Sequence, residues 1–508
     1  MKTRTMLSLL VIASLFANSG CQELLEEIIK HRGGDHPPAE NPADFREVGQ
    51  IALGTEGAAE ITAYDPTTKK LFVVSNDTDS RIDVVDLHDP ANPTLLEAID
   101  ITPYGGGANS VAVSDGLLAV AVEADPAQDP GLVVFFSTDD LHEVRRVSVG
   151  ALPDMVTFSP DGRYALSANE GEPSDEYDTD PLGTVSIIDL DHDFAVTTLD
   201  FSAFEGQQAH LAKEGLRVFG PGATLAQDLE PEYIAVSEDS RYAWVSLQEN
   251  NGLARIDLAS KTIAEIFPLG FKDYSLSENA IDVSDRDDQI QLNPWPVFGM
   301  YQPDAIAAYE VDGVSYVVTA NEGDARDYDG FSEEERVEDL ALDAHAFPDA
   351  NKLQQEDQLG RLEITTTLGN TDDDEAYEKL YSYGARSFSI WDGLSGERVY
   401  DSGNELEKVV IAAGRYADGR SDAKGVEPEG VVLGTIGHQT IAFIGLERVD
   451  AVAVYDVTNP FAPQFLQLLE SGDAPEGLVF VTADDSPNGK SLFIVSSEDD
   501  GTVKLFQP

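Results

Sequence analysis

The chain has 508 residues, of which 42% are hydrophobic and 25% charged, a composition typical of folded proteins rather than disordered or collagen-like chains. Asp and Glu number 94 against 32 Lys and Arg, and the formal net charge of -62 argues against binding to nucleic acid or to anionic lipid headgroups. A single cysteine excludes an internal disulfide framework and a cysteine-based zinc site, and eight histidines leave little material for a histidine-rich metal centre.

The first 20 residues have the features of a secretory signal peptide. Lys2 and Arg4 form a basic start, and the apolar stretch 6–16 is too short to span a bilayer as a mature helix. Residues 18–21 (NSGC) then resemble the end of a bacterial lipoprotein signal, in which the cysteine is acylated and becomes the mature N-terminus. The alternative is an ordinary secretory signal with an incidental cysteine. We expect acylation of Cys21, which anchors a protein without a transmembrane helix.

Residues 21–45 are predicted to form a tether, because a short helical start is followed by Gly, Pro and charged residues. Gln22 follows Cys21 at the position where an aspartate favours inner-membrane retention in some bacteria. The sequence therefore predicts a protein of the bacterial cell envelope, at the outer membrane or cell surface. Contact with the membrane is expected through the lipid anchor only.

From residue 46 onward the hydrophobic pattern has a period of two, in short β-branched runs such as 71–75 and 409–413 that end in turn residues. One unit recurs seven times: an apolar strand, a turn, a second strand, an acidic turn and a third strand that often ends in Asp-Leu or Asp-Val. The units begin at Glu60, Asn109, Asp154, Glu232, Asp304, Glu429 and Glu476.

This repetition predicts an all-β fold, a seven-bladed β-propeller over residues 46–508 in which four-stranded units are arranged radially. The last unit ends after its third strand at 502–506, and the segment 46–53 stands unassigned ahead of the first unit. We expect this N-terminal strand to complete the last blade. A two-domain β-sandwich is the alternative fold.

Five segments carry a resemblance to a known family: 293–304 (NPWPVFGMYQPD), 319–324 (TANEGD), 384–391 (GARSFSIW), 424–430 (KGVEPEG) and 443–448 (FIGLER). Together they resemble the choice-of-anchor I proteins, which include the mesenchyme-specific cell surface glycoproteins. The resemblance covers nearly the whole mature chain. It implies a surface-exposed propeller of the YVTN/WD40-like kind whose members differ in how they are anchored. Some relatives carry the label alkaline phosphatase.

Alignment of the seven units places acidic residues in two columns. The first residue of a unit is acidic in six of seven cases: Glu60, Asp154, Glu232, Asp304, Glu429 and Glu476. The turn after the second strand is acidic in all seven: Asp77, Glu123, Glu170, Glu249, Glu322, Glu447 and Glu498. Composition alone gives about 1.3 acids per seven positions, so both columns are enriched.

In a propeller, equivalent ends of the innermost strands surround one mouth of the central channel. Six carboxylates there repel one another unless a cation lies among them. Oxygen ligands without His or Cys favour a hard ion, and Ca²⁺ is expected before Mg²⁺ because it tolerates irregular geometry. The alternative is that the acids cap strands and bond backbone amides in turns, which applies most to the second column.

Basic residues are scarce, and several lie in or beside the family-like segments. Arg326, Arg386, Arg420, Lys424 and Arg448 are candidate ligands for a phosphate or carboxylate group that a metal ion polarises. Each is alternatively a salt-bridge partner for the abundant acids. The acid-rich insertion at about 329–383 is expected to be either a lid or a large surface loop.

Two functions remain open from the sequence. The first is a surface module that binds an unknown surface ligand in a cation-dependent way. The second is a metal-dependent phosphomonoesterase that acts on a phosphorylated small molecule, with ring carboxylates holding Ca²⁺ and arginines holding phosphate. No Gly-x-Ser-x-Gly, Walker or zinc-protease motif is present to decide between them.

Overall fold

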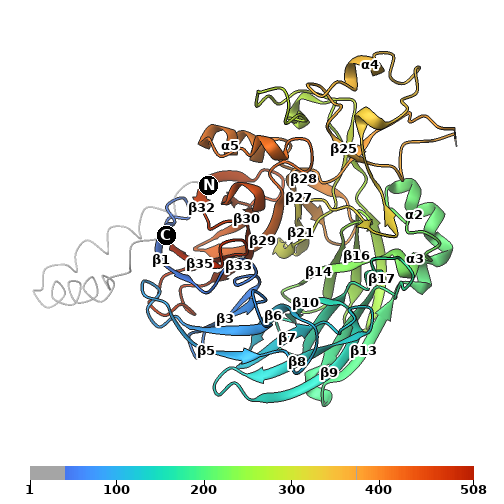
Figure 1. Ribbon diagram of the computed structural model, residues 1–508. Helices are drawn as coiled ribbons and strands as arrows, with labels where there is room; N and C mark the ends of the chain where they lie inside the picture. The colour runs from blue at the N-terminus through green and yellow to red at the C-terminus, as the bar shows by residue number, and fades with distance from the viewer. Residues whose placement is uncertain (1–39, 373) are drawn as a thin grey trace, which may run out of the picture. The chain divides into compact units, whose positions relative to one another are not determined.

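Short segments rich in Val, Ile and Phe dictate the architecture, because such residues fit the pleated surface of a sheet. A computed structural model describes residues 40–372 and 374–508, in which Pro42–Pro508 forms one unit (Figure 1). The predicted signal at 1–20, Cys21 and the tether as far as residue 39 lie outside the described residues. In the described ranges, no helix has both the length and the apolar character needed to cross a membrane.

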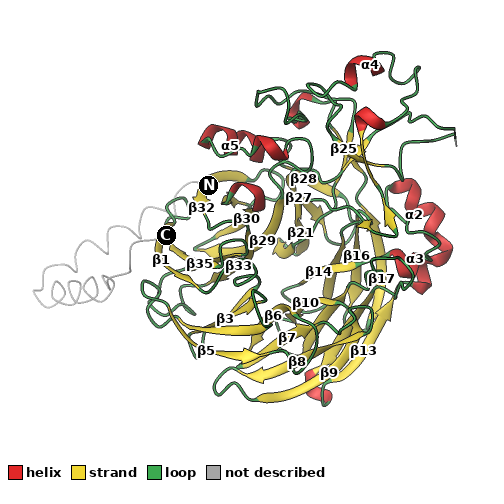
Figure 2. Cartoon of the chain, in the orientation of Figure 1, coloured by secondary structure: helices red, strands yellow, loops and turns green. Residues whose placement is uncertain are grey.

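Within residues 40–372 and 374–508 the chain forms seven four-stranded antiparallel sheets (Figure 2). The first four are β2 (Thr62–Asp65), β3 (Lys70–Ser75), β4 (Arg81–Asp86) and β5 (Thr94–Asp100); β6 (Ala108–Ser114), β7 (Leu117–Val122), β8 (Pro130–Ser137) and β9 (Glu143–Ala151); β10 (Pro153–Phe158), β11 (Tyr164–Asn169), β12 (Thr184–Asp189) and β13 (Ala195–Asp200); and β14 (Pro231–Val236), β15 (Tyr242–Leu247), β16 (Gly252–Asp257) and β17 (Thr262–Pro268).

The fifth sheet contains β20 (Ile306–Val311), β21 (Val314–Asn321), β27 (Ser387–Asp392) and β28 (Arg398–Asp401). The sixth contains β29 (Pro428–Ile436), β30 (Gln439–Leu446), β31 (Ala451–Asp456) and β32 (Gln464–Glu470). The seventh contains β33 (Pro475–Val481), β34 (Leu492–Ser497), β35 (Thr502–Gln507) and the N-terminal strand β1 (Arg46–Ala52). The first strands of consecutive sheets contact one another in the order β2, β6, β10, β14, β20, β29 and β33, and β33 contacts β2. This arrangement is a β-propeller, as the repeats predicted.

The N-terminal strand completes the last sheet. β1 pairs antiparallel with β35, from Arg46 opposite Gln507 to Ala52 opposite Thr502, and the two ends of the colour range meet there in Figure 1. The expectation for the segment 46–53 is therefore confirmed. Phe45, which we assigned to the tether, is 3% exposed and its ring meets that of Phe443 edge-on at 5.2 Å.

Apolar side chains fill the spaces between neighbouring sheets. Phe443 of β30 stacks on Phe493 of β34 with ring centroids 4.2 Å apart and an angle of 11° between the rings. Val120 of β7 belongs to a core cluster that also contains Phe72 and Val74 of β3. Burial of such surface, at about 25 cal/mol per Å², holds each sheet against the next.

The insertion lies between β21 and β27 and carries β22 (Asp327–Tyr328), β23 (Phe331–Ser332), β24 (Glu334–Arg336), α4 (Ala350–Leu353), β25 (Glu363–Thr365) and β26 (Tyr381–Ser382). It packs on a segment that includes β18 (Phe271–Asp273) and β19 (Phe298–Met300). Leu359, Leu362 and Ile364 are fully buried there with Tyr274 and Val283. The insertion thus shares a hydrophobic core of its own with the chain before β20.

Helices are few in the described chain: α2 (Gln208–Glu214), α3 (Leu225–Asp228), α4 and α5 (Glu405–Ala413). Short 3-10 turns are η1 (Leu190–His192), η2 (Ser202–Gln207), η3 (Ser277–Asn279), η4 (Val337–Asp339), η5 (Asp418–Arg420) and η6 (Glu447–Val449). The run 409–413, which we predicted as a strand, is the end of α5. Leu406 and Val410 are four residues apart and both buried, and Gly414 ends the helix in a left-handed conformation.

Candidate metal centre

Residues of the first acidic column stand at irregularities in strand pairing. Pro153 pairs with Asn169 and Met155 with Ala168, so Asp154 is left out of the ladder. The pairing skips Asn109, Glu232, Glu429 and Glu476 in the same way. A bulge of this kind re-aims the extra side chain. The backbone of four first strands therefore presents its acid in a similar way, whereas Glu60 and Asp304 lie just before β2 and β20, which pair regularly with the next strand.

A second backbone feature ties the two columns together. Leu152, Glu427 and Ala474 each precede a proline and adopt a left-handed conformation, with φ of 46°, 47° and 55°. The carbonyl oxygens of these three residues accept hydrogen bonds from the backbone N–H groups of second-column acids: Glu170 at 2.8 Å, Glu447 at 3.0 Å and Glu498 at 2.9 Å, respectively. Main-chain bonds thus hold a second-column residue beside a first-column residue of the same sheet.

The first column meets at one cavity of about 420 Å³. Residues in or beside all seven first strands line it, including Asn109, Asp154, Glu232, Asp304, Glu429 and Glu476. Glu60 is not among the lining residues, and its Oε2 accepts a hydrogen bond of 2.8 Å from Asn76 Nδ2. Five of the six predicted acids therefore share one chamber, and the sixth lies beside it.

Burial shifts the proton affinity of these acids. Burial, together with repulsion from neighbouring carboxylates, raises the pKa of Asp154 and of Glu60 to about 7. Burial, followed by repulsion from other carboxylates, also holds the pKa of Glu232, Asp304, Glu429 and Glu476 well above the usual range. A carboxylate in this chamber is costly in its charged form unless a cation or proton accompanies it.

Second-column residues divide by their partners. Asp77 forms an ion pair with Arg81, which lies four residues later and lowers the pKa of Asp77. Glu123 is half-buried, and burial raises its pKa. Glu498 acts electrostatically on Glu60 and Glu476. The remaining members are Glu170, Glu249, Glu322 and Glu447. Each has a carboxylate oxygen within 4.8 Å of oxygens from first-column or other acids.

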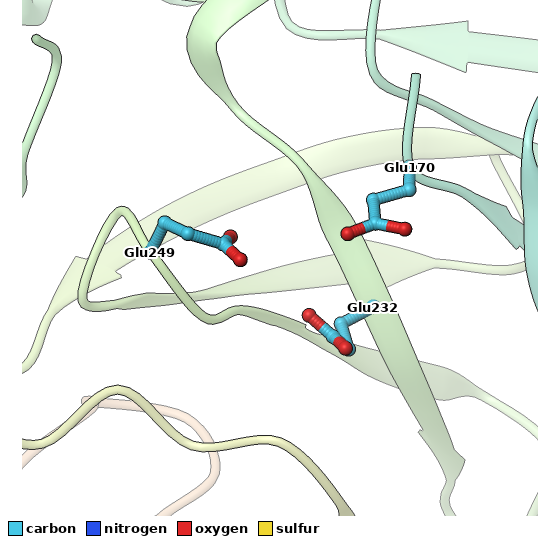
Figure 3. Close-up of side chains that lie close together, drawn as sticks. All are labelled: Glu170, Glu232 and Glu249. Atoms are coloured by element: carbon cyan, nitrogen blue, oxygen red, sulfur yellow. The ribbon is translucent and has the colours of Figure 1, made fainter. Parts of the chain in front are cut away.

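Three groups of carboxylates in the channel each place one oxygen per residue within 4.8 Å of the others. They are Glu170, Glu232 and Glu249, shown in Figure 3; Asp304, Glu322 and Glu429; and Glu322, Glu427 and Glu447. Each group mixes the two columns or adds a residue beside them. Such spacing suits oxygen ligands of one hard cation.

Three of the five candidate basic residues meet at Glu427, whose side chain is fully buried. Arg420 Nη2 lies 2.7 Å from its Oε1, and Arg448 Nε lies 3.3 Å from its Oε2. Lys424 Nζ lies 3.8 Å from Glu427 Oε2 and 3.1 Å from oxygens of both Glu322 and Asp324. These cations therefore neutralise the acids on one side of the channel.

Arg326 and Arg386 are committed elsewhere. Arg326 is 2% exposed and pairs with Asp228 at 2.6 Å and Glu230 at 2.7 Å. Arg386 is equally buried, pairs with Glu407 and donates to three backbone carbonyls, those of Asp282, Ser421 and Ala423. Both guanidinium groups are bound to protein acceptors, which is the salt-bridge alternative left open by the sequence.

Sequence reasoning missed Glu427 and Glu230, although a signal was available. Glu-Pro-Glu occurs at 230–232 and at 427–429, and in both cases the last residue belongs to the first column. Proline precedes five of the six first-column acids in all. In four of these five cases the Pro-acid pair coincides with the shift in strand pairing, the exception being Pro303-Asp304.

The fold and chamber define a β-propeller with an acidic channel. Residues 60–460 match the Choice-of-anchor I domain, so the chain belongs to the choice-of-anchor I family. It is 31% identical over 188 residues to Gigasin-3a of Magallana gigas, an alignment that covers 30% of this chain and 66% of that protein. It is 27% identical over 302 residues to Mesenchyme-specific cell surface glycoprotein of Strongylocentrotus purpuratus, covering 49% of this chain and 38% of that protein.

The chain thus spans less than two thirds of the length of either curated relative. Among solved structures, Kuenenia stuttgartiensis Hydrazine Synthase superposes with a TM-score of 0.47 at 12% identity, covering 89% of this chain and 96% of that chain.

Proposed function

We propose that this protein is a surface-anchored propeller that binds a divalent cation, Ca²⁺ before Mg²⁺, in its acidic channel and uses the cation to hold a ligand. The observation that carries the proposal is the single chamber lined by Asp154, Glu232, Asp304, Glu429 and Glu476. These groups carry only oxygen donors, which suit hard cations. A bound cation also offsets the repulsion among them.

Placement at the cell surface is supported by two features. The lipoprotein-like signal ending at Cys21 provides an anchor in the bacterial envelope, and a relative is named a cell surface glycoprotein. The net charge of -62 favours a partner other than nucleic acid. Membrane contact through the lipid anchor alone fits this proposal.

A phosphomonoesterase is the second candidate, favoured by one observation: Arg420, Lys424 and Arg448 gather beside the channel acids. All three are already paired with carboxylates: Arg420 with Glu427, Lys424 with Glu322, and Arg448 with Glu427 and Glu447, so a phosphate competes with these acids. Binding without catalysis is therefore the better supported function. Hydrolysis of p-nitrophenyl phosphate by the calcium-loaded protein, lost on Arg448→Met, would support the enzyme instead.

The test of the cation proposal is metal content and thermal melting of the full-length protein, before and after treatment with a chelator, in 150 mM NaCl. A ligand at about 100 times its Kd stabilises the folded state by about 2.7 kcal/mol. We expect stoichiometric calcium in the loaded protein and a melting temperature at least roughly 3 °C higher than in the chelated protein. Absence of both bound metal and a shift would overturn the proposal.

A further inference from the structure

We infer that Glu170, Glu232 and Glu249 form the Ca²⁺ site of the channel, and that the cation lies off the channel centre between two neighbouring sheets. This inference rests on the proposed cation binding and names its residues. Glu170 directly follows β11, Glu232 lies in β14, and Glu249 follows β15 by two residues. One ligand therefore comes from the sheet β10–β13 and two from the sheet β14–β17.

The geometry of the three carboxylates fits one ion. One oxygen from each residue lies within 4.8 Å of the others, and Figure 3 shows the three carboxylates directed into the same space. Oxygens bound to Ca²⁺ at about 2.3–2.6 Å can be at most roughly 5 Å apart. Three carboxylates supply up to six oxygens, and Ca²⁺ takes six to eight, with water completing the shell.

Unsatisfied atoms give independent support. Glu249 is only 5% exposed, and its Oε2 is buried without a hydrogen-bond partner in the described chain. Oε2 of Glu232 is in the same condition. A buried carboxylate oxygen without a donor is strongly disfavoured, so these atoms call for a partner that the described side chains do not supply. Figure 3 shows the Glu249 carboxylate aimed at the other two.

Both other carboxylate groups of the channel contain Glu322, which already has a cation, although Asp304 and Glu429 form no ion pair in the described chain and Oε2 of Glu429 is buried without a partner. Both oxygens of Glu322 are occupied, Oε1 by Lys424 Nζ at 3.1 Å and Oε2 by Gln248 Nε2 at 3.0 Å. Glu427 is held by Arg420 and Arg448. By contrast, none of the described Lys, Arg or His side chains forms an ion pair with Glu170, Glu232 or Glu249.

Arg326 is a cation whose charge acts on one of the three glutamates, Glu249. Burial raises the pKa of Glu249 to about 7, and the positive charge of Arg326 offsets only part of that rise. Its two terminal nitrogens, however, contact Asp228 and Glu230, which together carry more negative charge than the guanidinium neutralises. Arg326 therefore leaves the three glutamates without a counter-ion of their own.

The experiment is calorimetric titration of Ca²⁺ into the metal-free full-length protein in 150 mM NaCl, where weak binding to the acidic surface is screened. Glu249→Gln and Glu170→Gln should each lower the affinity at least tenfold, and the double variant should abolish binding. The matched control is Glu334→Gln, which replaces a partly buried glutamate of the insertion and should change the affinity by less than threefold. Titration with Mg²⁺ alone should give weaker binding than Ca²⁺.

Folding is checked in the absence of metal, where replacing a repelled buried carboxylate by an amide should leave the melting temperature equal or higher. Wild-type affinity in the Glu249→Gln and Glu170→Gln variants, with loss of binding in Glu476→Gln, would overturn this site but leave cation binding in the channel intact. No binding of Ca²⁺ by the wild-type protein would overturn both this inference and the proposed function.

Discussion

The backbone N–H of Glu170 donates a hydrogen bond of 2.8 Å to the carbonyl oxygen of Leu152, two residues before Asp154. This bond joins the acid that follows the second strand to the residue just before the first strand of the same sheet, and so brings Glu170 near Asp154 along the chain. Because the bond belongs to the main chain, side-chain substitution at either acid leaves it in place. The acidic columns are therefore positioned by the fold, and amide variants are suitable probes of their charge.

Metal-free protein should lose stability as the pH rises from 5 to 8. Burial raises the pKa of Glu60 and Asp154 to about 7, above their values in an unfolded chain. Between about pH 4 and 7 the folded state therefore holds more protons than the unfolded state, so the free energy of unfolding falls as pH increases. We expect a fall of about 2 kcal/mol or more, measured by urea denaturation without added metal.

The double variant Glu60→Gln and Asp154→Asn should make this pH dependence less steep, because two of the six first-column acids with a raised pKa are then gone. A carboxylate with a lowered pKa has the opposite effect on stability. Asp401 is such a group, because Lys272 lowers its pKa, and it titrates below the tested range. Stability that rises between pH 5 and 8 in the metal-free wild type would contradict the prediction.

Arg326→Met should be strongly destabilising. Arg326, Asp228 and Glu230 are all nearly inaccessible to solvent, and removal of the guanidinium leaves two buried acids without their partner. Breaking a buried pair in this way costs about 3–5 kcal/mol. Arg46→Met is the control, because Arg46 pairs with Asp44 at the surface, where such a pair contributes about 0–1 kcal/mol. Equal unfolding free energies for the two variants would refute the structural role of Arg326.

The sequence predicted the sheets and the chamber because both depend on local, repeated signals. Alternation of apolar residues marked the strands, and a fixed position at the start of each unit marked the acids that line the cavity, as at Glu232 and Glu476. Equivalent positions in radially repeated units fall at equivalent heights in the channel. The N-terminal strand could be assigned for the same reason, since the last unit lacked one strand.

The pairing of individual charges could not be predicted, because it depends on which loops meet in space. Lys424 reaches Glu322 across 102 positions of the chain, and nothing in either segment specifies that contact. Asp77 was placed in the second column by its position, yet Arg81 four residues later pairs with it. The run 409–413 was misread as strand because β-branched residues also occur in a short amphipathic helix that buries Leu406.

Gly384→Ala should destabilise the turn that carries Glu322. Gly384 has φ of +66°, and a Cβ there would lie 1.9 Å from the backbone oxygen of Glu322. Gly437 is the matched control, with φ of +64° and no atom within 4 Å of an added Cβ. Both substitutions incur about 1 kcal/mol for the left-handed backbone, and only Gly384→Ala adds a clash of about 1–3 kcal/mol. Chemical denaturation of the two variants measures the difference, and similar losses would show that the turn yields without cost.

Lys424→Met should test whether the ammonium group takes the place of a metal ion on its side of the channel. Lys424 is largely buried and contacts Glu322, Asp324 and Glu427, so its removal exposes Glu322 to the full repulsion of its neighbours. We expect a loss of about 3 kcal/mol of unfolding free energy in metal-free buffer.

Adding Glu322→Gln to Lys424→Met should recover part of that loss, because the uncompensated charge is then gone. The double-mutant cycle, measured by urea denaturation, isolates the interaction between the two side chains. Calcium at millimolar concentration should also stabilise Lys424→Met more than the wild type, since Asp304, Glu322 and Glu429 then form a second carboxylate group without a cation. Additive single losses, with equal calcium effects in both proteins, would mean that Lys424 only packs against the channel wall.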